Sequence, residues 1–274
     1  MTKFRLLVSL KACMNLKLRK RIVMSKLTKE YLFYTFFIMI VCWGIFLWCS
    51  VSGINIEDNY LLYLPYLLGG WSPTIASYVV LRKSGNVNSF KEWMKNVFDF
   101  KHSVSSYLTV VVFAVAYILI QCLVSGYEKG TPLYMIIVMI PMMIIAGGLE
   151  EAGWRYIFQP ELEKKYSYSV STIIVSVVWW LWHLPLFYVN NGAELGLNYI
   201  AYGVNVLGLS FALACIKKNT GSVWLCVLFH SIVNSLTGIY SVNENIWGNI
   251  VAAVVLIVFS HIFVKSNIVK RIMY

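Results

Sequence analysis

The stretch LYMIIVMIPMMIIAGGLEEAGWRYIF, residues 133–158, joins a long apolar run to three ionisable side chains, Glu150, Glu151 and Arg155. About 20 consecutive apolar residues span the ~30 Å hydrocarbon core of a bilayer as a helix. Ionisable side chains at membrane depth are costly, so their presence there indicates function. The stretch therefore predicts a membrane helix that carries a functional polar site.

Apolar runs of this kind recur along the whole chain. Hydrophobic residues make up 59% of its 274 residues and charged residues 13%, against about 25% charged residues in a soluble domain. The composition predicts an all-α, polytopic transmembrane helical bundle. About eight candidate membrane helices are expected, at 31–51, 60–81, 104–125, 133–158, 168–189, 197–216, 222–241 and 246–265.

The positive charges lie between the apolar spans and at the two ends of the chain. They gather in residues 1–30, 82–101, 164–165, 217–218 and 265–271, whereas the alternate connections carry mainly Glu and Asp. Basic loops stay on the cytoplasmic side of a membrane, so both termini are expected to be cytoplasmic. The formal net charge of +11 is thus explained by topology, and a nucleic-acid partner is not expected.

The same pattern divides the chain into four parts. We expect a basic cytoplasmic N-terminal segment at 1–30, N-terminal transmembrane helices at 31–129, a core at 130–241 that holds the buried ionisable residues discussed below, and a C-terminal helix with a basic tail at 242–274. Residues 85–101 are typical of an amphipathic segment on the inner surface. Two interpretations of the basic N-terminal stretch stay open: an interfacial helix on anionic lipid, or an over-extended start at residues 1–23, since Met24 precedes a plausible shorter chain.

Within the fourth apolar span, the two neighbouring carboxylates are predicted to play different roles. Glu151 and Arg155 stand at i and i+4 of a helix and can form an ion pair. Glu150 points about 100° away and lacks that partner. A carboxylate without a cationic partner in an apolar site is a candidate general base, so we assign reactivity to Glu150 and support to Glu151 and Arg155. The alternative is a buried structural ion network of all three.

Two later spans supply histidines at a matching depth. His183 shares a helix face with Trp179, and His230 shares one with Asn234. Taken singly, such histidines often serve as hydrogen-bonding residues between helices, and the Trp cluster before His183 favours packing. Counting at 1.5 Å per residue, Glu150, His183 and His230 lie roughly 18–22 Å from the basic connections. We therefore expect them to converge on one buried cavity that opens to the cytoplasm.

Several intramembrane chemistries lack their residues here. The chain has no HExxH and no GxSxG motif, and its only aspartates, Asp58 and Asp99, lie in connections. Two interpretations remain open. In one, Glu150 with His183 activates water while His230 and Asn234 donate hydrogen bonds to the oxyanion. In the other, Glu150, His183 and His230 ligate zinc and leave one position open for water.

In combination, these residues resemble three motifs of the CPBP family. They are Glu150-Glu151-x-x-x-Arg155, an aromatic residue four positions before His183, and His230-x-x-x-Asn234, spread over about residues 130–240. The family usually has Phe where this chain has Trp179. It includes type II CAAX prenyl endopeptidases and bacterial bacteriocin-processing or self-immunity proteins. The resemblance implies an eight-helix membrane protease with Glu150, His183, His230 and Asn234 in the site, acting through a metal or a metal-free glutamate.

The resemblance also implies a partner and a location. We expect an endopeptidase that cleaves a peptide or lipidated protein, prenylated CAAX-like or bacteriocin-type, reaching the site from the cytoplasmic side of a bacterial cytoplasmic membrane. One alternative is a proton-coupled transporter with Glu150, His183 and His230 as a relay. That class favours inverted repeats, which the sequence does not show. Another alternative is a non-catalytic scaffold or immunity protein.

Overall fold

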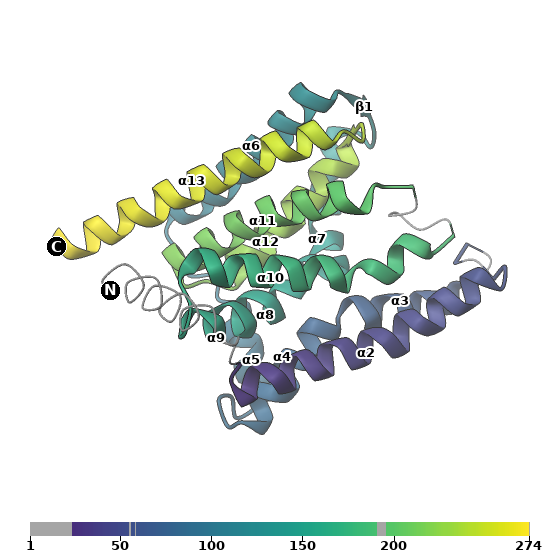
Figure 1. Cartoon of the computed structure of the whole chain (residues 1–274), viewed down its shortest axis with the longest axis horizontal. Helices are drawn as coiled ribbons and strands as arrows, with labels where there is room; N and C mark the ends of the chain where they lie inside the picture. The colour runs from purple at the N-terminus through teal and green to yellow at the C-terminus, as the bar shows by residue number, and fades with distance from the viewer. Residues whose placement is uncertain (1–23, 55, 58, 191–195, 274) are drawn as a thin grey trace, which may run out of the picture.

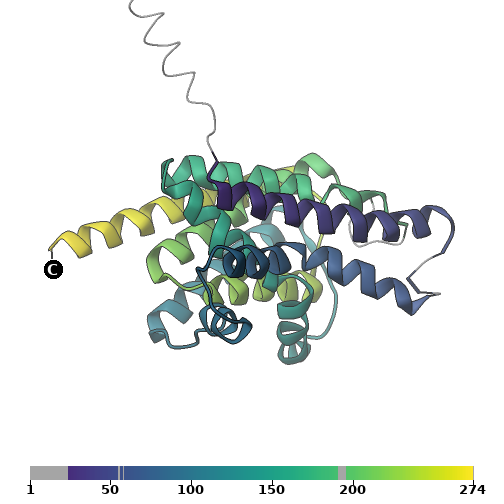
Figure 2. The ribbon, with the colours of Figure 1, turned by 90° about the horizontal axis from the view of Figure 1, so that it is seen from below.

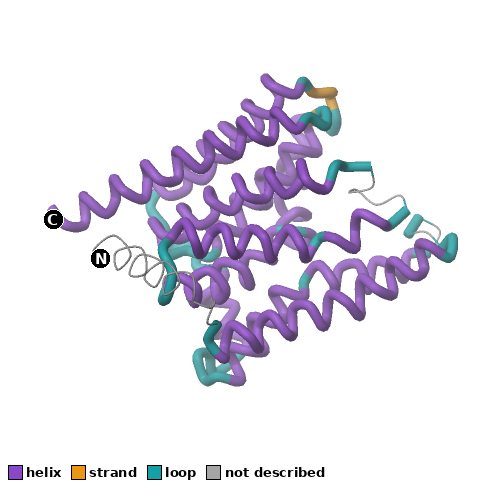
Figure 3. Tube along the Cα trace, viewed as in Figure 1, coloured by secondary structure: helices purple, strands orange, loops and turns teal. Residues whose placement is uncertain are grey.

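A computed structural model describes residues 24–54, 56–57, 59–190 and 196–273, and this part of the chain is almost entirely helical (Figure 3). The predicted all-α polytopic bundle is confirmed. In the described part, the only sheet is a small antiparallel pair, β1 (Tyr127–Lys129) with β2 (Tyr240–Val242), in which Glu128 lies opposite Ser241. The interpretation of residues 1–23 falls outside the described residues.

Each of the predicted spans contains helix, but not all are continuous. In the described residues, five helices are long and apolar enough to cross a membrane, and the number is six if a pair of helices bent by 41° counts as one broken span. The range 60–81 is interrupted at Trp71, just before Pro73, and α12 has only 16 residues. The helices are α2 (Lys26–Val51), α3 (Tyr63–Gly70), α4 (Ser72–Lys83), α5 (Phe90–Val97), α6 (Val104–Ser125), α7 (Ile136–Ala146), α8 (Glu151–Gly153), α9 (Gln159–Glu163), α10 (Tyr168–Trp182), α11 (Tyr199–Thr220), α12 (Trp224–Ile239) and α13 (Ile246–Met273).

Local sequence explains where the long helices begin and end. Ser103 and Ser167 cap the starts of α6 and α10, each accepting a hydrogen bond from a backbone N–H with its side-chain oxygen, and Asn198 does the same for α11. Such side chains satisfy N–H groups that the first turn leaves unpaired. Gly126 and Gly221, with φ of 74° and 72°, end α6 and α11, as glycine readily adopts positive φ.

The two ends of the bundle are built from different elements (Figure 1). At one end, which we call the basic end, α2 begins and α4, α9 and α11 finish; Lys83 pairs with Glu30, and Lys218 with Glu163. The far half of α13 joins this end through a hydrogen bond between His261 and Ser169. The opposite end, which we call the strand end, carries β1, β2 and the start of α11. Whether the basic end is cytoplasmic stays a prediction.

Packing is densest around α11. It contacts α10, α12 and α13, while α12 contacts α6 and α7. In the most apolar 18-residue stretch of each helix, 56% of the residues are buried in α11 and 22% in α2. The exposed apolar side chains of α2 suit contact with lipid. Viewed from below, α13 extends beyond the rest of the bundle (Figure 2). The polar site lies among α7, α10, α11 and α12.

The predicted amphipathic segment contains a short surface helix, α5. Ser89 caps it, and Trp93 and Val97 are buried while Lys91 and Lys95 are exposed. The Trp93 indole N–H donates to Ser77 Oγ on α4 at 3.0 Å, which fixes the helix against the bundle.

Candidate active site

The predicted fourth span is broken where its carboxylates begin. α7 ends at Ala146, a 3-10 turn covers Gly148–Glu150, and a π-helical turn follows at Trp154–Phe158. The break is possible because α12 packs directly on glycine backbone. A Cβ on Gly147 would lie 2.7 Å from Asn234 Nδ2, and one on Gly148 would lie 2.8 Å from the Val227 carbonyl oxygen. Local π-helical geometry is common at functional sites.

Glu150 is almost buried, and no Lys or Arg among the described residues pairs with it. The exposed fraction of the whole Glu150 residue is 7%, and its Oε2 accepts a hydrogen bond from the Trp179 indole N–H at 2.9 Å. The sequence analysis expected Arg155 to pair with Glu151 and not with Glu150, and in the structure Arg155 Nε bonds to Glu151. It did not predict the bond to Trp179, which was interpreted as a packing residue.

Trp179 in fact lies at the centre of the polar cluster. Its ring centroid lies 5.8 Å from that of His183 and 5.4 Å from that of His230. Its backbone oxygen lies 2.9 Å from His183 Nδ1. A carbonyl oxygen can only accept, so this contact places the proton of a neutral His183 on Nδ1 and leaves the lone pair of Nε2 free. One aromatic residue thus orients both the carboxylate and an imidazole.

Glu151 contacts both Arg155 and His230. Its Oε2 accepts a hydrogen bond from Arg155 Nε at 3.0 Å, and both side chains are fully buried. The predicted ion pair is therefore confirmed. Its Oε1 lies 3.0 Å from His230 Nδ1, a contact that the sequence analysis did not foresee. Glu151 thus contacts the His230 ring as well as Arg155.

A chain of side chains continues from Arg155 toward the basic end. Arg155 Nη1 donates to Gln159 Oε1 at 3.1 Å and Nη2 donates to Ser210 Oγ at 3.2 Å. Gln159 Nε2 in turn donates to Glu163 Oε1 at 2.8 Å and to Thr172 Oγ1 at 3.1 Å. A buried guanidinium needs all its donors satisfied, and this network supplies acceptors from three helices.

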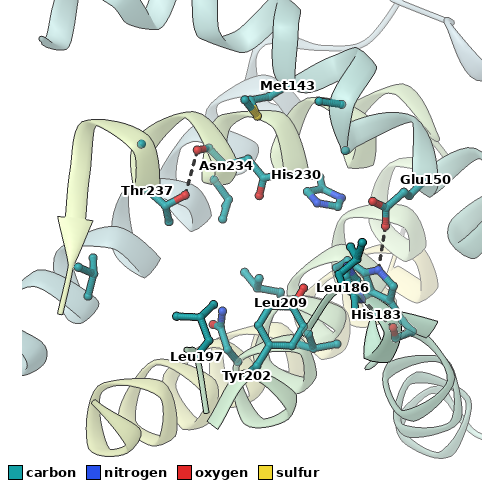
Figure 4. Close-up of a pocket in the computed structure, with 18 of the residues that line it drawn as sticks. Met143, Glu150, His183, Leu186, Leu197, Tyr202, Leu209, His230, Asn234 and Thr237 are labelled. Atoms are coloured by element: carbon teal, nitrogen blue, oxygen red, sulfur yellow. Dashed lines mark hydrogen bonds between the residues drawn. The ribbon is translucent and has the colours of Figure 1, made fainter. Parts of the chain in front are cut away.

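Glu150, His183, His230 and Asn234 all line one cavity of about 670 Å³. In Figure 4 the carboxylate and the two imidazoles converge at one end of it, with Asn234 and Thr237 further along α12. His230 Nε2 and Asn234 Nδ2 lie on the same side of Gly147, at 3.5 and 2.7 Å from the position of a Cβ there. The structure thus brings together the four predicted site residues.

The direction in which the cavity opens differs from the prediction. Its lining runs from Glu150 to the strand end and includes the exposed residues Leu197, Asn198 and Glu244, and none of the lysines of the basic end lines it. The prediction that the cavity opens on the side of the basic connections is therefore wrong. A depth of roughly 18–22 Å from those connections already leaves only about 8–12 Å of a ~30 Å core on the other side.

The donor set does not fit a three-ligand zinc site. Among the described residues, no group of three His, Cys, Asp or Glu side chains is arranged to hold a metal ion. The Nδ1 contacts of His183 and His230 leave both Nε2 atoms free, as in many metal-bound histidines, so it is the spatial arrangement of the side chains, and not their hydrogen bonds, that does not fit. The chemistry of the site is therefore derived below from the side chains alone.

Comparison with known proteins points to one family. The family described as Type II CAAX prenyl endopeptidase Rce1-like matches residues 131–236. The chain is also similar to CAAX prenyl protease 2 of Methanococcus maripaludis, with 26% identity over 229 residues, which covers 75% of this chain and 82% of the relative. The matched range contains every residue of the polar cluster described above.

Proposed function

Because the chain belongs to the CPBP family of intramembrane endopeptidases, we propose that Glu150 activates the water molecule that cleaves its substrate. The chain is a multi-pass membrane protease, and a peptide or protein is its substrate. The supporting observation is the position of Glu150: a nearly buried carboxylate, hydrogen-bonded by Trp179 and facing the same cavity as two imidazoles. The carboxylate keeps further lone pairs that can accept a proton.

In the proposed reaction, Glu150 removes a proton from water, and His183 Nε2 accepts a hydrogen bond from the same water molecule. The resulting hydroxide attacks the carbonyl carbon of the scissile peptide bond. Glu150 then passes the proton to the departing amide nitrogen, and the C–N bond breaks to give a carboxylic acid and an amine. The acid then loses its remaining proton to the amine, so the final products are a carboxylate and an ammonium group. Each proton that leaves the water is thereby accounted for.

The oxyanion of the tetrahedral intermediate is assigned to His230 and Asn234. Glu151 accepts from His230 Nδ1, so a ring that also carries a proton on Nε2 is stabilised by an adjacent carboxylate. The Asn234 side-chain N–H groups lie beside it, over Gly147. Removing one oxyanion donor typically costs about 10²–10³ in kcat, so Asn234→Ala is expected to reduce kcat by that factor.

Glu150→Gln tests the proposal. The substitution keeps the size of the side chain and removes the base, so turnover should fall by about 10²–10⁴ while the melting temperature in detergent stays close to that of the unmodified protein. Single-turnover cleavage of a fluorogenic peptide by purified protein provides the measurement. Cleavage at the normal rate by Glu150→Gln would refute the assignment of the base.

The substrate class and the membrane are proposed as well. We assign a membrane-associated substrate, prenylated CAAX-like or bacteriocin-type, and location in a bacterial cytoplasmic membrane. The residues of the proposed machinery all come from the proposed catalytic core at 130–241, whereas α2, α3, α6 and α13 contribute further walls of the cavity. Paired peptides with and without an isoprenyl group distinguish the two substrates, because only the first class predicts a dependence of KM on the lipid.

A further inference from the structure

The two sides of the cavity differ in chemistry between the polar cluster and the strand end. On the side of α2, α3 and α10 the wall is aromatic, with Trp43, Trp71 and Trp182. The indole N–H groups of these three donate within the protein, to the Tyr66 carbonyl at 2.9 Å, the Ile145 carbonyl at 2.6 Å and Ser72 Oγ at 3.1 Å. This wall therefore offers the cavity apolar ring surface.

The wall made by α6, α11 and α13 is polar. It carries Tyr117, Gln121, Asn205 and Asn249, which we call the amide wall. Gln121 Nε2 donates to Asn249 Oδ1 at 2.7 Å and to the Tyr117 hydroxyl at 3.4 Å, and Asn205 is also hydrogen-bonded to that hydroxyl. Figure 1 places α6 and α13 on the side of the bundle away from α2 and α3.

The amide wall keeps hydrogen-bonding capacity that the protein itself does not use. With Oδ1 facing Gln121, the two N–H groups of Asn249 have no side-chain partner among the described residues. The Tyr117 hydroxyl accepts from Gln121 Nε2, and Asn205 lies beside it on the same wall. These groups line the cavity, so a ligand there can accept hydrogen bonds from Asn249 and exchange hydrogen bonds with the hydroxyl and amide groups beside it.

An extended polypeptide has the matching chemistry. Every peptide unit carries an N–H donor and a C=O acceptor that must be paired when it leaves water. An acyl or isoprenyl chain offers neither. The side chains of an extended segment alternate, so they can reach the aromatic wall while the main chain bonds to the amide wall. From His230 to Thr237 α12 rises about 10 Å, which corresponds to roughly three extended residues.

We propose that the amide wall binds the main chain of an extended peptide substrate, which reaches Glu150 from the strand end. This inference rests on the proposed protease function and adds the binding mode and the direction of approach. Glu244, whose carboxylate accepts from the Asn198 backbone N–H, and the exposed Asn243 form the mouth through which the segment passes.

Single amide-to-Leu substitutions test the binding surface. Asn249→Leu and Asn205→Leu should each raise KM about 3- to 10-fold, the effect of one lost hydrogen bond, and leave kcat unchanged, because the interaction is equally strong in the ground and transition states. Asn96→Leu is the matched control: it also removes an amide–hydroxyl bond, to Tyr156 on the surface at 2.9 Å, and should leave KM unchanged. Unchanged KM in both wall variants, with normal melting temperatures, would overturn the proposal.

Modified substrates provide a measurement that does not depend on how the variants fold. Peptides N-methylated at single bonds outside the scissile bond lose one main-chain donor each and should bind the inactive Glu150→Gln protein several-fold more weakly, measured by fluorescence anisotropy. Equal affinity for methylated and unmethylated peptides would contradict main-chain binding. If the unmodified protein cleaves no peptide at all, the proposed function itself fails, and that result is distinct from cleavage with unaltered KM.

The direction of approach is tested by blocking either end. In protein freed of its native cysteines, Asn245→Cys at the mouth and Lys217→Cys at the basic end are labelled with a bulky maleimide. Labelling at Asn245→Cys should abolish cleavage, and labelling at Lys217→Cys should not. The reverse outcome would place the substrate path at the basic end and refute the proposal.

Discussion

Replacing Glu151 by glutamine should destabilise the protein far more than an ordinary substitution. Both Glu151 and Arg155 are fully buried, and a neutral amide in place of the carboxylate would leave the guanidinium with only neutral acceptors, Gln159 and Ser210 among them. Breaking one partner of a buried ion pair costs on the order of 3–5 kcal/mol. At about 2–4 °C per kcal/mol for a chain of this size class, the melting temperature should fall by roughly 6–20 °C.

The double change Glu151→Gln with Arg155→Met separates the charge from the packing. It removes the uncompensated cation, so part of the lost stability should return, while activity stays low because His230 has lost its carboxylate partner. Lys218→Met is a control, because its ion pair with Glu163 lies at the surface and such pairs contribute about 0–1 kcal/mol. Melting curves in detergent measure all three. If Glu151→Gln melts normally and cleaves normally, the buried network does not support the site.

Four further outcomes are expected. Gly147→Ala should lower kcat at least tenfold, because its Cβ would press on Asn234 Nδ2, whereas Gly44→Ala, with nothing within 4 Å, should have no effect on purified-enzyme activity. Trp179→Phe should lower kcat by about 10- to 100-fold, since a hydrogen bond to a charged group contributes about 1.5–3 kcal/mol. Cleavage should persist in a membrane-permeant chelator, and loss of activity that zinc restores would contradict the metal-free reaction. Cysteine labelling from outside intact cells should miss Lys217→Cys and reach Asn198→Cys; the opposite pattern would reverse the predicted topology.

The features that the sequence predicted well are those set by neighbouring residues. The predicted span 104–125 has the same limits as α6, because Ser103 and Gly126 mark its ends. The Glu151–Arg155 pair was predictable because residues four apart share a helix face. The convergence of Glu150 with the two histidines was predictable from depth, since helices crossing one membrane share a common axis along which residues can be counted.

The features that were missed depend on contacts between distant segments. The bond from Trp179 to Glu150 joins residues 29 positions apart, and that from Gln121 to Asn249 joins residues 128 apart. A tryptophan in an apolar helix suits packing equally well, so no local pattern indicated the bond. The bend at Gly147 was also missed, because it depends on the approach of α12 rather than on the local apolar pattern.

The predicted topology and the observed cavity together constrain where the protease meets its substrate. The cavity opens at the strand end, and the positive charges gather at the other end. If the basic end is cytoplasmic, as the charge rule predicts, the cavity opens away from the cytoplasm, and a substrate cannot enter it from the cytoplasmic side. Substrate must then reach Glu150 from the non-cytoplasmic side or from that leaflet. From Arg155, which shares the Glu151 carboxylate with His230, a network of paired polar groups runs through Gln159 to Glu163 and Thr172 toward the basic end.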